Sequence, residues 1–348
     1  MNIYDISRRA GVSIATVSRV LNGSGKVSEA TRQKILSIIE ETGYTPNAFA
    51  RGLGLNTMHT IGILCADSSD SFLALAIYLL EQGLRAHGYD SLLCCTGYDP
   101  QVRRQYLDLL LSKRVDAVIL VGSNFVEAKP EYNQYILDAA REIPVVIVNG
   151  YLEGPQIYCS LCDDYEALHL ATTRFAIQGR KRLLYLYRTL SYSGRRKLAG
   201  FEDACRSLGL PQEQFYSACV NGTIYETRDY LKNLWEQRKF DAILTSDDEM
   251  AIGALKFARV QGLSVPQDLS ILGYNNSKLG LCCDPELSTV DNQLGFACTS
   301  AISLLTKALA KEPVPSRIIL SGQILHRGTT DRAFAQVGEN QKNPIQGE

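Results

Sequence analysis

The sequence predicts an α/β protein with a small all-α head and a larger core built from two doubly wound parallel sheets. Residues 3–22 show apolar side chains at helical spacing, interrupted by a glycine. From residue 61 onward, short apolar runs without polar alternation are separated by helical stretches, which is typical of parallel strands covered on both faces. This alternation occurs twice along the chain. The core is therefore expected to have two halves that face each other across a cleft.

The head begins with two short helices joined by a tight turn. Gly11 lies between them, where the chain needs a residue that adopts positive φ. Ser13 follows as the N-cap of the second helix, because its hydroxyl can accept a hydrogen bond from an otherwise unpaired N–H group. Each helix has one apolar face, and these faces can close on each other: Ile3, Ile6, Ala10, Val12, Val17, Val20 and Leu21.

The opposite face of the second helix carries short or forked side chains near the helix N-terminus. Such side chains can approach base edges and phosphates, as the recognition helix of a helix-turn-helix does. An ordinary αα-hairpin at the edge of a larger fold would show a similar spacing of glycine and apolar residues. The candidate DNA-binding residues on this face are Ser13, Ile14, Ala15, Thr16, Ser18, Arg19 and Asn22.

A third helix is predicted over residues 29–42, and residues 46–59 form a connector to the core. Pro46 suits the first position of a short helix in this connector. That helix would span about two turns, which is less than the ~12–15 residues that an isolated helix needs in water. Gly52 and Gly54 weaken it further. We therefore expect the connector helix to form only against a partner.

The core pattern predicts the order of strands and helices. In the first half, strands are expected at residues 61–65, 91–95, 117–121 and 145–148, with helices at 72–87, 105–113 and 135–141. The second half starts near residue 164, and its strand candidates are residues 183–186, 242–245 and 270–273. Ligands bind such folds at the carboxyl ends of the strands.

Composition narrows the classes of protein that fit. A hydrophobic content of 45% supports sizeable cores, and no apolar run is long enough to cross a membrane. The chain begins with an amphipathic helix rather than a secretory signal, so we expect a cytoplasmic protein. Residues 1–60 hold seven Lys and Arg against four Asp and Glu, although the whole chain carries a net charge of −1. A mildly basic head on an acidic core favours a nucleic-acid partner for the head.

The ten cysteines include two adjacent pairs and a C-x-x-C formed by Cys159 and Cys162. A metal or redox site is one interpretation of this spacing. A structural zinc site needs four clustered ligands, however, and none of the four histidines stands at ligand spacing from these cysteines. Cys65, Cys94 and Cys95 lie in predicted strands, where thiols pack as small hydrophobic groups. We therefore expect buried reduced thiols, no metal and no cofactor.

The head resembles the N-terminus of the LacI/GalR family of bacterial transcription regulators. That family typically reads D-V-A-x-x-A-G-V-S-x-x-T-V-S-R-V-L-N, and the matching residues here are Asp5 to Ser7, Ala10 to Ser13 and Thr16 to Asn22. The core is similar to the family at residues 248–253, 269–274 and 285–290, which resemble N-D-x-M-A-x-G, D-I-S-V-V-G-Y and P-x-L-T-T-V. The resemblance covers the chain from residue 2 to about residue 331.

The resemblance implies a domain organisation. Residues 1–45 form a helix-turn-helix DNA-binding domain, residues 46–59 a hinge helix or linker, and residues 60–331 a periplasmic-binding-protein-like core for effector binding and dimerisation. The N-subdomain of the core is expected to comprise about residues 60–160 and 291–320, and the C-subdomain about residues 161–290 and 321–331. Residues 332–348 are polar and lack a leucine heptad, so we expect a disordered tail and a homodimer rather than a tetramer.

The resemblance also implies how double-stranded DNA is bound. The second helix would enter the major groove and the hinge helix the minor groove, and a dimer would bind a pseudo-palindromic operator. Bases would be read by Ile14, Ala15 and Arg19, and phosphates held by Ser13, Thr16, Ser18 and Asn22. The connector would contribute Asn47, Ala50 and Leu53, with Leu53 as a wedge between central base pairs.

Seven residues at expected strand ends are candidates for binding a small effector, which the resemblance implies is a sugar or a sugar derivative. Amides, carboxylates and a cation satisfy vicinal hydroxyl groups, and an aromatic ring covers the C–H face of a sugar. Each residue could instead be a loop residue or a helix cap. The candidates are Asp70, Phe72, Asn149, Ser193, Lys197, Asp248 and Asn275.

Four positions depart from the family pattern, namely three of these candidates and Asn276, which follows Asn275. Lys197 stands where the family usually has arginine, and lysine keeps the charge but loses the bidentate fork. Asn149, Asn275 and Asn276 stand where the family has aspartate. These changes leave open a neutral or an anionic ligand whose hydrogen-bond demands differ from those of the usual sugar effectors.

Together these features predict a DNA-binding transcriptional regulator, a repressor, whose operator affinity is controlled by an effector bound between the two subdomains. A ligand that favours one arrangement of the subdomains would change the spacing of the hinge segments in the dimer. A solute-binding protein for transport would not need the head. An enzyme on this fold would show a motif such as G-x-S-x-G or G-x-x-x-x-G-K, which the sequence lacks. We expect no enzyme activity and no membrane contact, with nucleoid association while DNA is bound.

Overall fold

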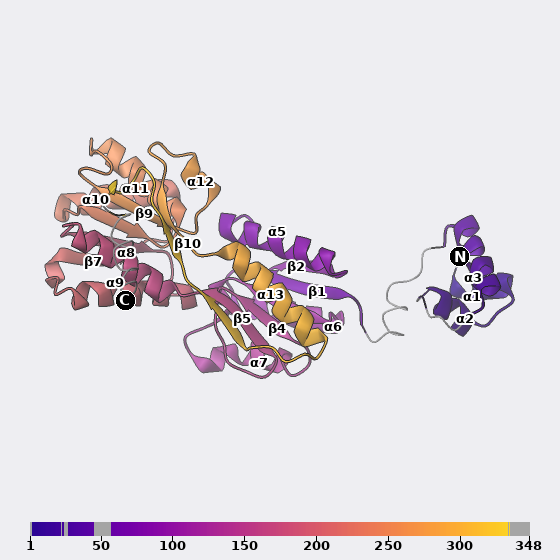
Figure 1. The fold of residues 1–348 in the computed structure, drawn as a ribbon. Helices are drawn as coiled ribbons and strands as arrows, with labels where there is room; N and C mark the ends of the chain where they lie inside the picture. The colour runs from indigo at the N-terminus through magenta and orange to yellow at the C-terminus, as the bar shows by residue number, and fades with distance from the viewer. Residues whose placement is uncertain (1, 22, 24–26, 45–56, 333, 335–348) are drawn as a thin grey trace, which may run out of the picture.

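The computed structural model of the chain describes residues 2–21, 23, 27–44, 57–332 and 334. These residues form a three-helix head and a core with two six-stranded sheets covered by helices (Figure 1). The predicted α/β class is confirmed. No helix within the described ranges is long and apolar enough to cross a bilayer. The predicted connector helix lies outside these ranges, as do four candidate DNA-binding residues: Asn22, Asn47, Ala50 and Leu53.

The head folds as its apolar pattern predicts. Its helices are α1 (Ile3–Ala10), α2 (Ile14–Leu21) and α3 (Glu29–Thr42). Gly11 ends α1 with a φ of 69°, and the Ser13 hydroxyl accepts a hydrogen bond of 3.2 Å from the Thr16 N–H group at the start of α2. The small core between the three helices consists of Ile6, Ala10, Val17, Val20 and Ile35.

The first half of the core, the N-half, is a fully parallel sheet in the order β11-β5-β4-β3-β1-β2. Its strands are β1 (Thr60–Cys65), β2 (Asp90–Cys95), β3 (Ala117–Val121), β4 (Val145–Val148), β5 (Ile157–Cys162) and β11 (Arg317–Leu320). Helices α5 (Ser71–Ala86) and α13 (Leu294–Leu309) pack on one face. Helices α6 (Pro100–Ser112) and α7 (Gln134–Ala139) pack on the other.

The second half, the C-half, has the strand order β12-β10-β9-β8-β6-β7 and is parallel except at β12. Its strands are β6 (Leu183–Tyr187), β7 (Phe215–Cys219), β8 (Ala242–Thr245), β9 (Ser270–Tyr274), β10 (Ser288–Asp291) and β12 (Gln323–Leu325). Helices α8 (Asp164–Ile177) and α9 (Tyr192–Ser207) cover one face, and α10 (Ile224–Gln237) and α11 (Asp248–Val260) cover the other. Short helices complete the fold: η1 (Ser123–Phe125), η2 (Pro130–Asn133), η3 (Gln212–Gln214) and α12 (Lys278–Leu281).

The chain passes between the two halves three times. It leaves the first sheet after β5, returns after β10 to form α13 and β11, and leaves again to form β12. Figure 1 shows these connections in the middle of the core, between the two sheets. Each half is therefore built from segments that are distant in sequence. Three chain segments connect the two halves.

The C-x-x-C motif lies on strand β5. Residues three apart on a strand point to opposite faces, so the two thiols cannot approach one another. Cys159 packs into the core beneath α6 and α7, whereas the Cys162 sulfur lies 3.8 Å from the Tyr274 hydroxyl in the C-half. Within the described residues, no group of three or more His, Cys, Asp or Glu side chains could hold a metal ion. The expectation of buried thiols is wrong for Cys95 and Cys219, which are exposed on the edge strands β2 and β7, and for Cys282, which is exposed at the end of a short helix. Cys94 and Cys283 are only half-buried.

Two other expectations are corrected by the structure. Helix α6 begins at Pro100 rather than near residue 105, because Asp99 caps it by accepting a hydrogen bond of 2.7 Å from the Gln101 N–H group. Phe334, which the sequence placed in the polar tail, is fully buried, with its ring centroid 4.5 Å from that of Phe175. The apolar side chain of Phe334 extends the core of the C-half past residue 331.

Candidate functional site: recognition helix and interdomain cleft

Helix α2 presents one polar face to solvent. Ser13, Ile14, Ala15 and Arg19 are exposed, and Thr16 and Ser18 are half-buried. The Ser13 and Thr16 hydroxyl oxygens lie 2.9 Å apart, which orders the first turn of the helix. Because Val17 and Val20 are buried in the head, the predicted contact residues are held together on the outer side of the helix. This is the geometry in which a helix can enter a major groove.

A cleft of about 430 Å³ lies between the two halves of the core, at the carboxyl ends of their strands. Residues that directly follow β1, β2, β3 and β4 line it from the N-half, and residues that follow β6, β7, β8 and β9 line it from the C-half. The volume is typical of a small-molecule site. Six of the seven predicted effector residues line the cleft: Asp70, Phe72, Asn149, Ser193, Lys197 and Asn275.

The N-half contributes side chains that its own turns hold in place. Asp70 is the N-cap of α5 and accepts a hydrogen bond of 2.9 Å from the Leu73 N–H group. Burial raises the pKa of the Asp70 carboxyl. Asn149 follows β4 with a φ of 64°, and Asn275 of the C-half has a φ of 95°. Asparagine adopts this left-handed region more readily than most residues, so the amides that replace the family's aspartates suit the backbone.

Lys197 reaches the cleft from α9 but is almost fully buried. Its ammonium group donates a hydrogen bond of 3.0 Å to the Ser246 carbonyl and lies 3.6 Å from the centroid of the Tyr274 ring. The Tyr274 hydroxyl in turn donates to the Asp164 carboxylate. Burial lowers the pKa of Lys197, and the nearby carboxylates of Asp164 and Asp247 oppose that shift. The lysine is thus held by the C-half before any ligand arrives.

Arg188 and Asp247 form an ion pair in the cleft that sequence reasoning missed. The Arg188 Nε donates to Asp247 Oδ2 over 2.7 Å, and its Nη2 donates to Asp247 Oδ1 and to Glu249 Oε2, each over 3.2 Å. A remaining guanidinium N–H donates to the Gly222 carbonyl. The available signal was position, because Arg188 comes directly after β6 and Asp247 comes just after β8.

The predicted ligand role of Asp248 is wrong. Its side chain is buried beneath the cleft, where Oδ1 accepts a hydrogen bond of 2.6 Å from the Thr289 hydroxyl and Oδ2 accepts one of 2.6 Å from the Ser277 N–H group. Asp248 therefore ties the start of α11 to the loop after β9 and to strand β10. Its neighbour Asp247 lines the cleft and caps α11 through the Met250 N–H group.

A direct hydrogen bond crosses the cleft. The Ser123 hydroxyl of the N-half donates to the Ser191 hydroxyl of the C-half over 2.8 Å. Ser191 is also the N-cap of α9, so the bond joins a loop of one half to the end of a helix of the other. The two halves therefore meet in an arrangement that a ligand can favour or oppose.

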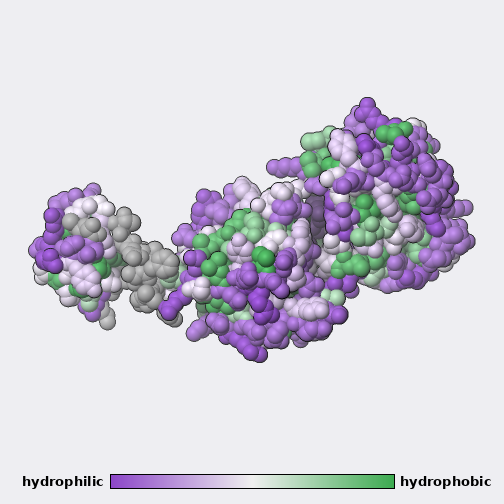
Figure 2. Space-filling view, turned by 180° about the vertical axis from the view of Figure 1, so that it is seen from behind, coloured by the Kyte–Doolittle hydropathy of each residue, from purple (hydrophilic) through white to green (hydrophobic). Residues whose placement is uncertain are grey.

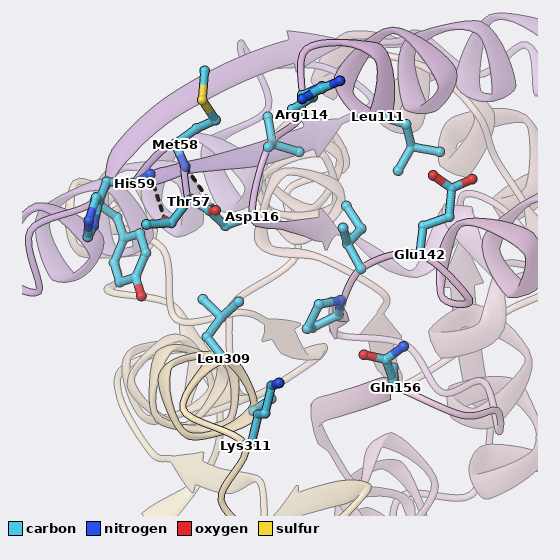
Figure 3. A pocket seen from close by; sticks show the side chains of 15 residues that line it. Thr57, Met58, His59, Leu111, Arg114, Asp116, Glu142, Gln156, Leu309 and Lys311 are labelled. Atoms are coloured by element: carbon cyan, nitrogen blue, oxygen red, sulfur yellow. Dashed lines mark hydrogen bonds between the residues drawn. The ribbon is translucent and has the colours of Figure 1, made fainter. Parts of the chain in front are cut away.

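A larger cavity of about 720 Å³ lies at the opposite end of the N-half, where its strands begin (Figure 3). None of the predicted site residues lines it. The Asp116 carboxylate accepts hydrogen bonds of 3.0 Å from the Met58 N–H group and 2.9 Å from the Thr60 N–H group. These bonds fix the start of β1 directly after the connector. The cavity is thus the place where the core is joined to the preceding segment, and the cleft remains the candidate ligand site.

Comparisons with known proteins agree with this geometry. Residues 2–47 match the family model of bacterial regulatory proteins of the lacI family, and residues 58–303 match the model of periplasmic binding proteins and the sugar-binding domain of the LacI family. An HTH-type transcriptional regulator of Lachnoclostridium phytofermentans is 53% identical over 95% of this chain and 100% of its own length. Catabolite control protein A of Priestia megaterium is 31% identical over 94% of this chain and 97% of its own length.

Solved structures show the same fold at lower identity. The lac repressor dimer bound to operator and the anti-inducer ONPF superposes with a TM-score of 0.84 at 21% identity, over 95% of this chain and 99% of the other. The complex of the transcriptional regulator CelR with cellobiose has a TM-score of 0.68 at 23% identity, over 94% of this chain and 99% of the other. The family matches span both the head and most of the core, and the relatives are named as regulators rather than enzymes. The chain belongs to the LacI family of bacterial transcriptional regulators.

Proposed function

We propose that the chain is a homodimeric, cytoplasmic repressor, and that a neutral sugar bound in the cleft sets its affinity for a pseudo-palindromic operator. The observation that carries the proposal is the combination, in one chain, of an exposed DNA-type helix face and a polar cleft at the carboxyl ends of two sheets. Two structural neighbours support it: the lac repressor is a dimer on its operator, and CelR holds cellobiose.

The charges of the cleft favour a neutral ligand. Arg188 is paired with Asp247 and Glu249, so its guanidinium is already neutralised. Lys197 is buried, bonded to a carbonyl and close to carboxylates. A phosphate would need a cation without such partners. The amides of Asn149 and Asn275 and the hydroxyl of Ser193 instead suit the hydroxyl groups of an uncharged sugar.

The surface of the core supports a dimer. Figure 2 shows hydrophobic surface on both halves of the core. In the N-half, exposed apolar side chains lie on two neighbouring elements, helix α5 and the edge strand β2: Leu75, Tyr78, Leu92 and Leu93. In the C-half, a second set lies on α12, on its neighbour α11, and on α10, which packs on α11: Tyr225, Val260, Leu279 and Leu281. Single exposed apolar residues are ordinary, but groups on adjacent elements mark an interface. A two-fold dimer through these faces would give a pseudo-palindromic operator two recognition helices.

The proposed switch is a shift between two arrangements of the halves. A ligand that contacts both sides of the cleft favours one arrangement over the other. Because Asp116 fixes residues 58 and 60 to the N-half, a rotation of the N-halves changes the separation of the two connectors in the dimer. The recognition helices then fit the operator in one arrangement and not in the other.

Thermal unfolding of the full chain tests the ligand class. We expect a neutral sugar to raise the melting temperature, and the matching sugar phosphate and nucleosides to leave it unchanged. Asp70→Ser keeps an N-cap for α5 but removes the carboxylate from the cleft, so it should abolish the shift. Asp99→Ser makes the same change at the cap of α6, outside the cleft lining, and should keep it. Stabilisation by the sugar phosphate alone would overturn the neutral-ligand proposal.

A further inference from the structure

A groove of about 550 Å³ lies beside the cleft on the same end of the N-half. One wall is the start of α6, which contributes Gln101, Arg104 and Gln105. The Arg104 guanidinium lies 5.9 Å from the centroid of the Tyr135 ring, so it stacks on the facing wall. The other wall is the segment that leads from β3 into α7, with Glu131, Tyr132 and Tyr135. Neither the predicted site residues nor the cleft lining includes any of these side chains.

The second wall is rigid. The buried side chain of Asn133 accepts a hydrogen bond of 2.8 Å from the Glu127 N–H group and donates one of 3.0 Å to the Glu127 carbonyl. The Tyr135 hydroxyl donates to the Phe125 carbonyl over 3.3 Å. These bonds fix the path of the chain around Tyr132. The groove is therefore a formed feature of the fold, with little ordering left to do when a ligand binds.

The side chains that line the groove suit a carbohydrate. The ring of Tyr132 is 56% exposed, and the Lys129 ammonium lies 5.6 Å from its centroid. Glu131 forms no ion pair with any residue that the structure describes, and the amides of Gln101 and Gln105 stand on the facing wall. A pyranose has an apolar C–H face and a rim of hydroxyl groups. An aromatic ring flanked by amides and a carboxylate meets both requirements.

The groove and the cleft share a buried support. Arg103 is 5% exposed, and its guanidinium donates to the carbonyls of Tyr98 over 2.9 Å and Asn124 over 2.6 Å. It also donates to the Glu127 carboxylate over 2.9 Å. Tyr98 and Asn124 line the cleft, whereas Glu127 lines the groove. The two cavities are thus neighbours on one rigid rim, which would place a ligand that extends out of the cleft against the groove.

We propose that this groove is a second subsite, and that it takes the further units of a neutral oligosaccharide whose first unit occupies the cleft. The inference rests on the proposed function, since it extends the ligand of the same cleft. Tyr132 provides the stacking face, and Glu131, Gln101 and Gln105 bind hydroxyl groups of the distal unit. A single exposed tyrosine at the surface would be ordinary, but this one lies in a preformed groove that Arg103 links to the lining of the ligand site.

Titration calorimetry of the full chain with sugars of increasing length tests the subsite. The probes are two series of linear glucose oligosaccharides from one to four units, one α-1,4-linked and one β-1,4-linked. In one series we expect affinity to rise by about tenfold when the chain becomes long enough to reach the groove. Tyr132→Ala should remove this gain and leave the affinity for the shortest bound sugar unchanged, and Tyr132→Phe should restore it.

The control variant is Tyr4→Ala, which removes a tyrosine of similar exposure from α1 in the head, and it should keep the gain. An affinity independent of length would overturn the subsite while leaving sugar binding in the cleft intact. Equal losses for short and long sugars in Tyr132→Ala would overturn it too. If no sugar of either series binds the wild-type chain, both the subsite and the proposed function fail. This outcome can be told apart from failure of the subsite alone, because the shortest sugars report on the cleft alone.

Discussion

At the scale of single residues, the ionised groups around the cleft are held by partners within the protein. Arg188 is bound by two carboxylates, Lys197 by a carbonyl and an aromatic face, and Asp248 by a hydroxyl and an N–H group. Such groups keep their position when the cleft is empty, so they offer a preorganised surface. Selectivity is then left to the side chains with capacity for further hydrogen bonds, above all Asn149 and Asn275.

Replacement of Asp248 should affect stability and its dependence on pH. Burial raises the pKa of Asp248 above its value in the unfolded chain, so the native state binds this proton more tightly. Its contribution to stability is therefore largest at acid pH and is lost as pH rises through the native pKa. Asp248→Asn carries no titrating group. The free energy of unfolding of the wild type relative to this variant should fall as pH rises above about 4, where the carboxyl titrates in the unfolded chain.

Two further variants control this experiment. Asp248→Ala leaves the Thr289 hydroxyl and the Ser277 N–H group without their acceptor, so it should reduce the free energy of unfolding by about 1–3 kcal/mol. Thr299→Ala, which removes an exposed hydroxyl on α13 and no titrating group, should change stability by an amount that does not depend on pH. A free energy of unfolding of the wild type, relative to that of Asp248→Asn, that rises with pH would contradict the assignment.

Arg19 is the side chain on α2 best suited to recognise guanine, because its guanidinium can bind two acceptors of that base at once. Arg19→Ala should weaken operator binding by about 1–3 kcal/mol and relax specificity at one base pair of each half-site. Fluorescence anisotropy with duplexes that vary at single positions measures both effects. Arg85→Ala, at an exposed arginine of the core, is the control. Unchanged operator binding by Arg19→Ala would show that α2 does not read the groove as proposed.

At the scale of elements, the environment of each cysteine follows from its strand or helix. Cys162, Cys205 and Cys298 are buried, and burial raises the pKa of each thiol to about 12. Cys95 lies on an edge strand and Cys219 at the end of another, and both are exposed. The ten thiols thus fall into classes set by strand position rather than by their spacing in the sequence.

Alkylation of the native chain with iodoacetamide tests these classes. At about pH 8 the buried thiols should stay unmodified, since they are shielded and almost wholly protonated. The exposed Cys219, which lies on β7 outside the proposed dimer faces, should react. Mass spectrometry of the peptides reads out each site, and denatured protein, in which all ten should react, is the control. Rapid modification of Cys162 or Cys298 in folded protein would contradict the packing described.

The position of each strand in its sheet explains which strands the sequence could predict. Long apolar runs gave the strands β1, β3, β4 and β8 because each lies in the middle of a sheet. Strand β5 was missed because Ser160 and two cysteines interrupt its apolar pattern. In the cleft, Asn149 and Asn275 directly follow β4 and β9 and were predicted, whereas Arg188 after β6 was missed and Asp248 was chosen in place of Asp247. Asp247 is the N-cap of α11 and Asp248 is its first residue, so their side chains point in different directions. Tertiary packing decides which of the two faces the cleft.

At the scale of the whole molecule, two halves joined by three chain crossings meet through few polar contacts at the cleft. Ser123→Ala removes the direct bond to Ser191 and leaves the cap of α9 in place. Because a neutral hydrogen bond contributes about 0.5–1.5 kcal/mol, the variant should bind the cleft ligand about two- to tenfold more weakly. Calorimetry measures the change, with Ser112→Ala on α6 as the control. Tighter binding by Ser123→Ala would show that the bond opposes the liganded arrangement.

Residues 58–60 are where the core is fixed to the connector, through the two hydrogen bonds to Asp116. Asp116→Ala should leave ligand affinity in the cleft unchanged and weaken the effect of the ligand on operator affinity. Anisotropy titrations with and without ligand, paired with calorimetry, separate the two properties. Asp138→Ala, at an exposed aspartate of α7, is the control. If Asp116→Ala responds to ligand as the wild type does, the path between cleft and head runs elsewhere.

The central claim is that occupancy of the cleft controls DNA binding. The measurement that tests it most directly is the affinity of the full chain for a duplex selected by the protein from a random library, with and without the sugar that raises its melting temperature. We predict a pseudo-palindromic duplex bound by one dimer, with an affinity that the sugar changes at least about fivefold in the wild type and not in Asp70→Ser. A sugar that stabilises the core but leaves operator affinity unchanged would contradict the account.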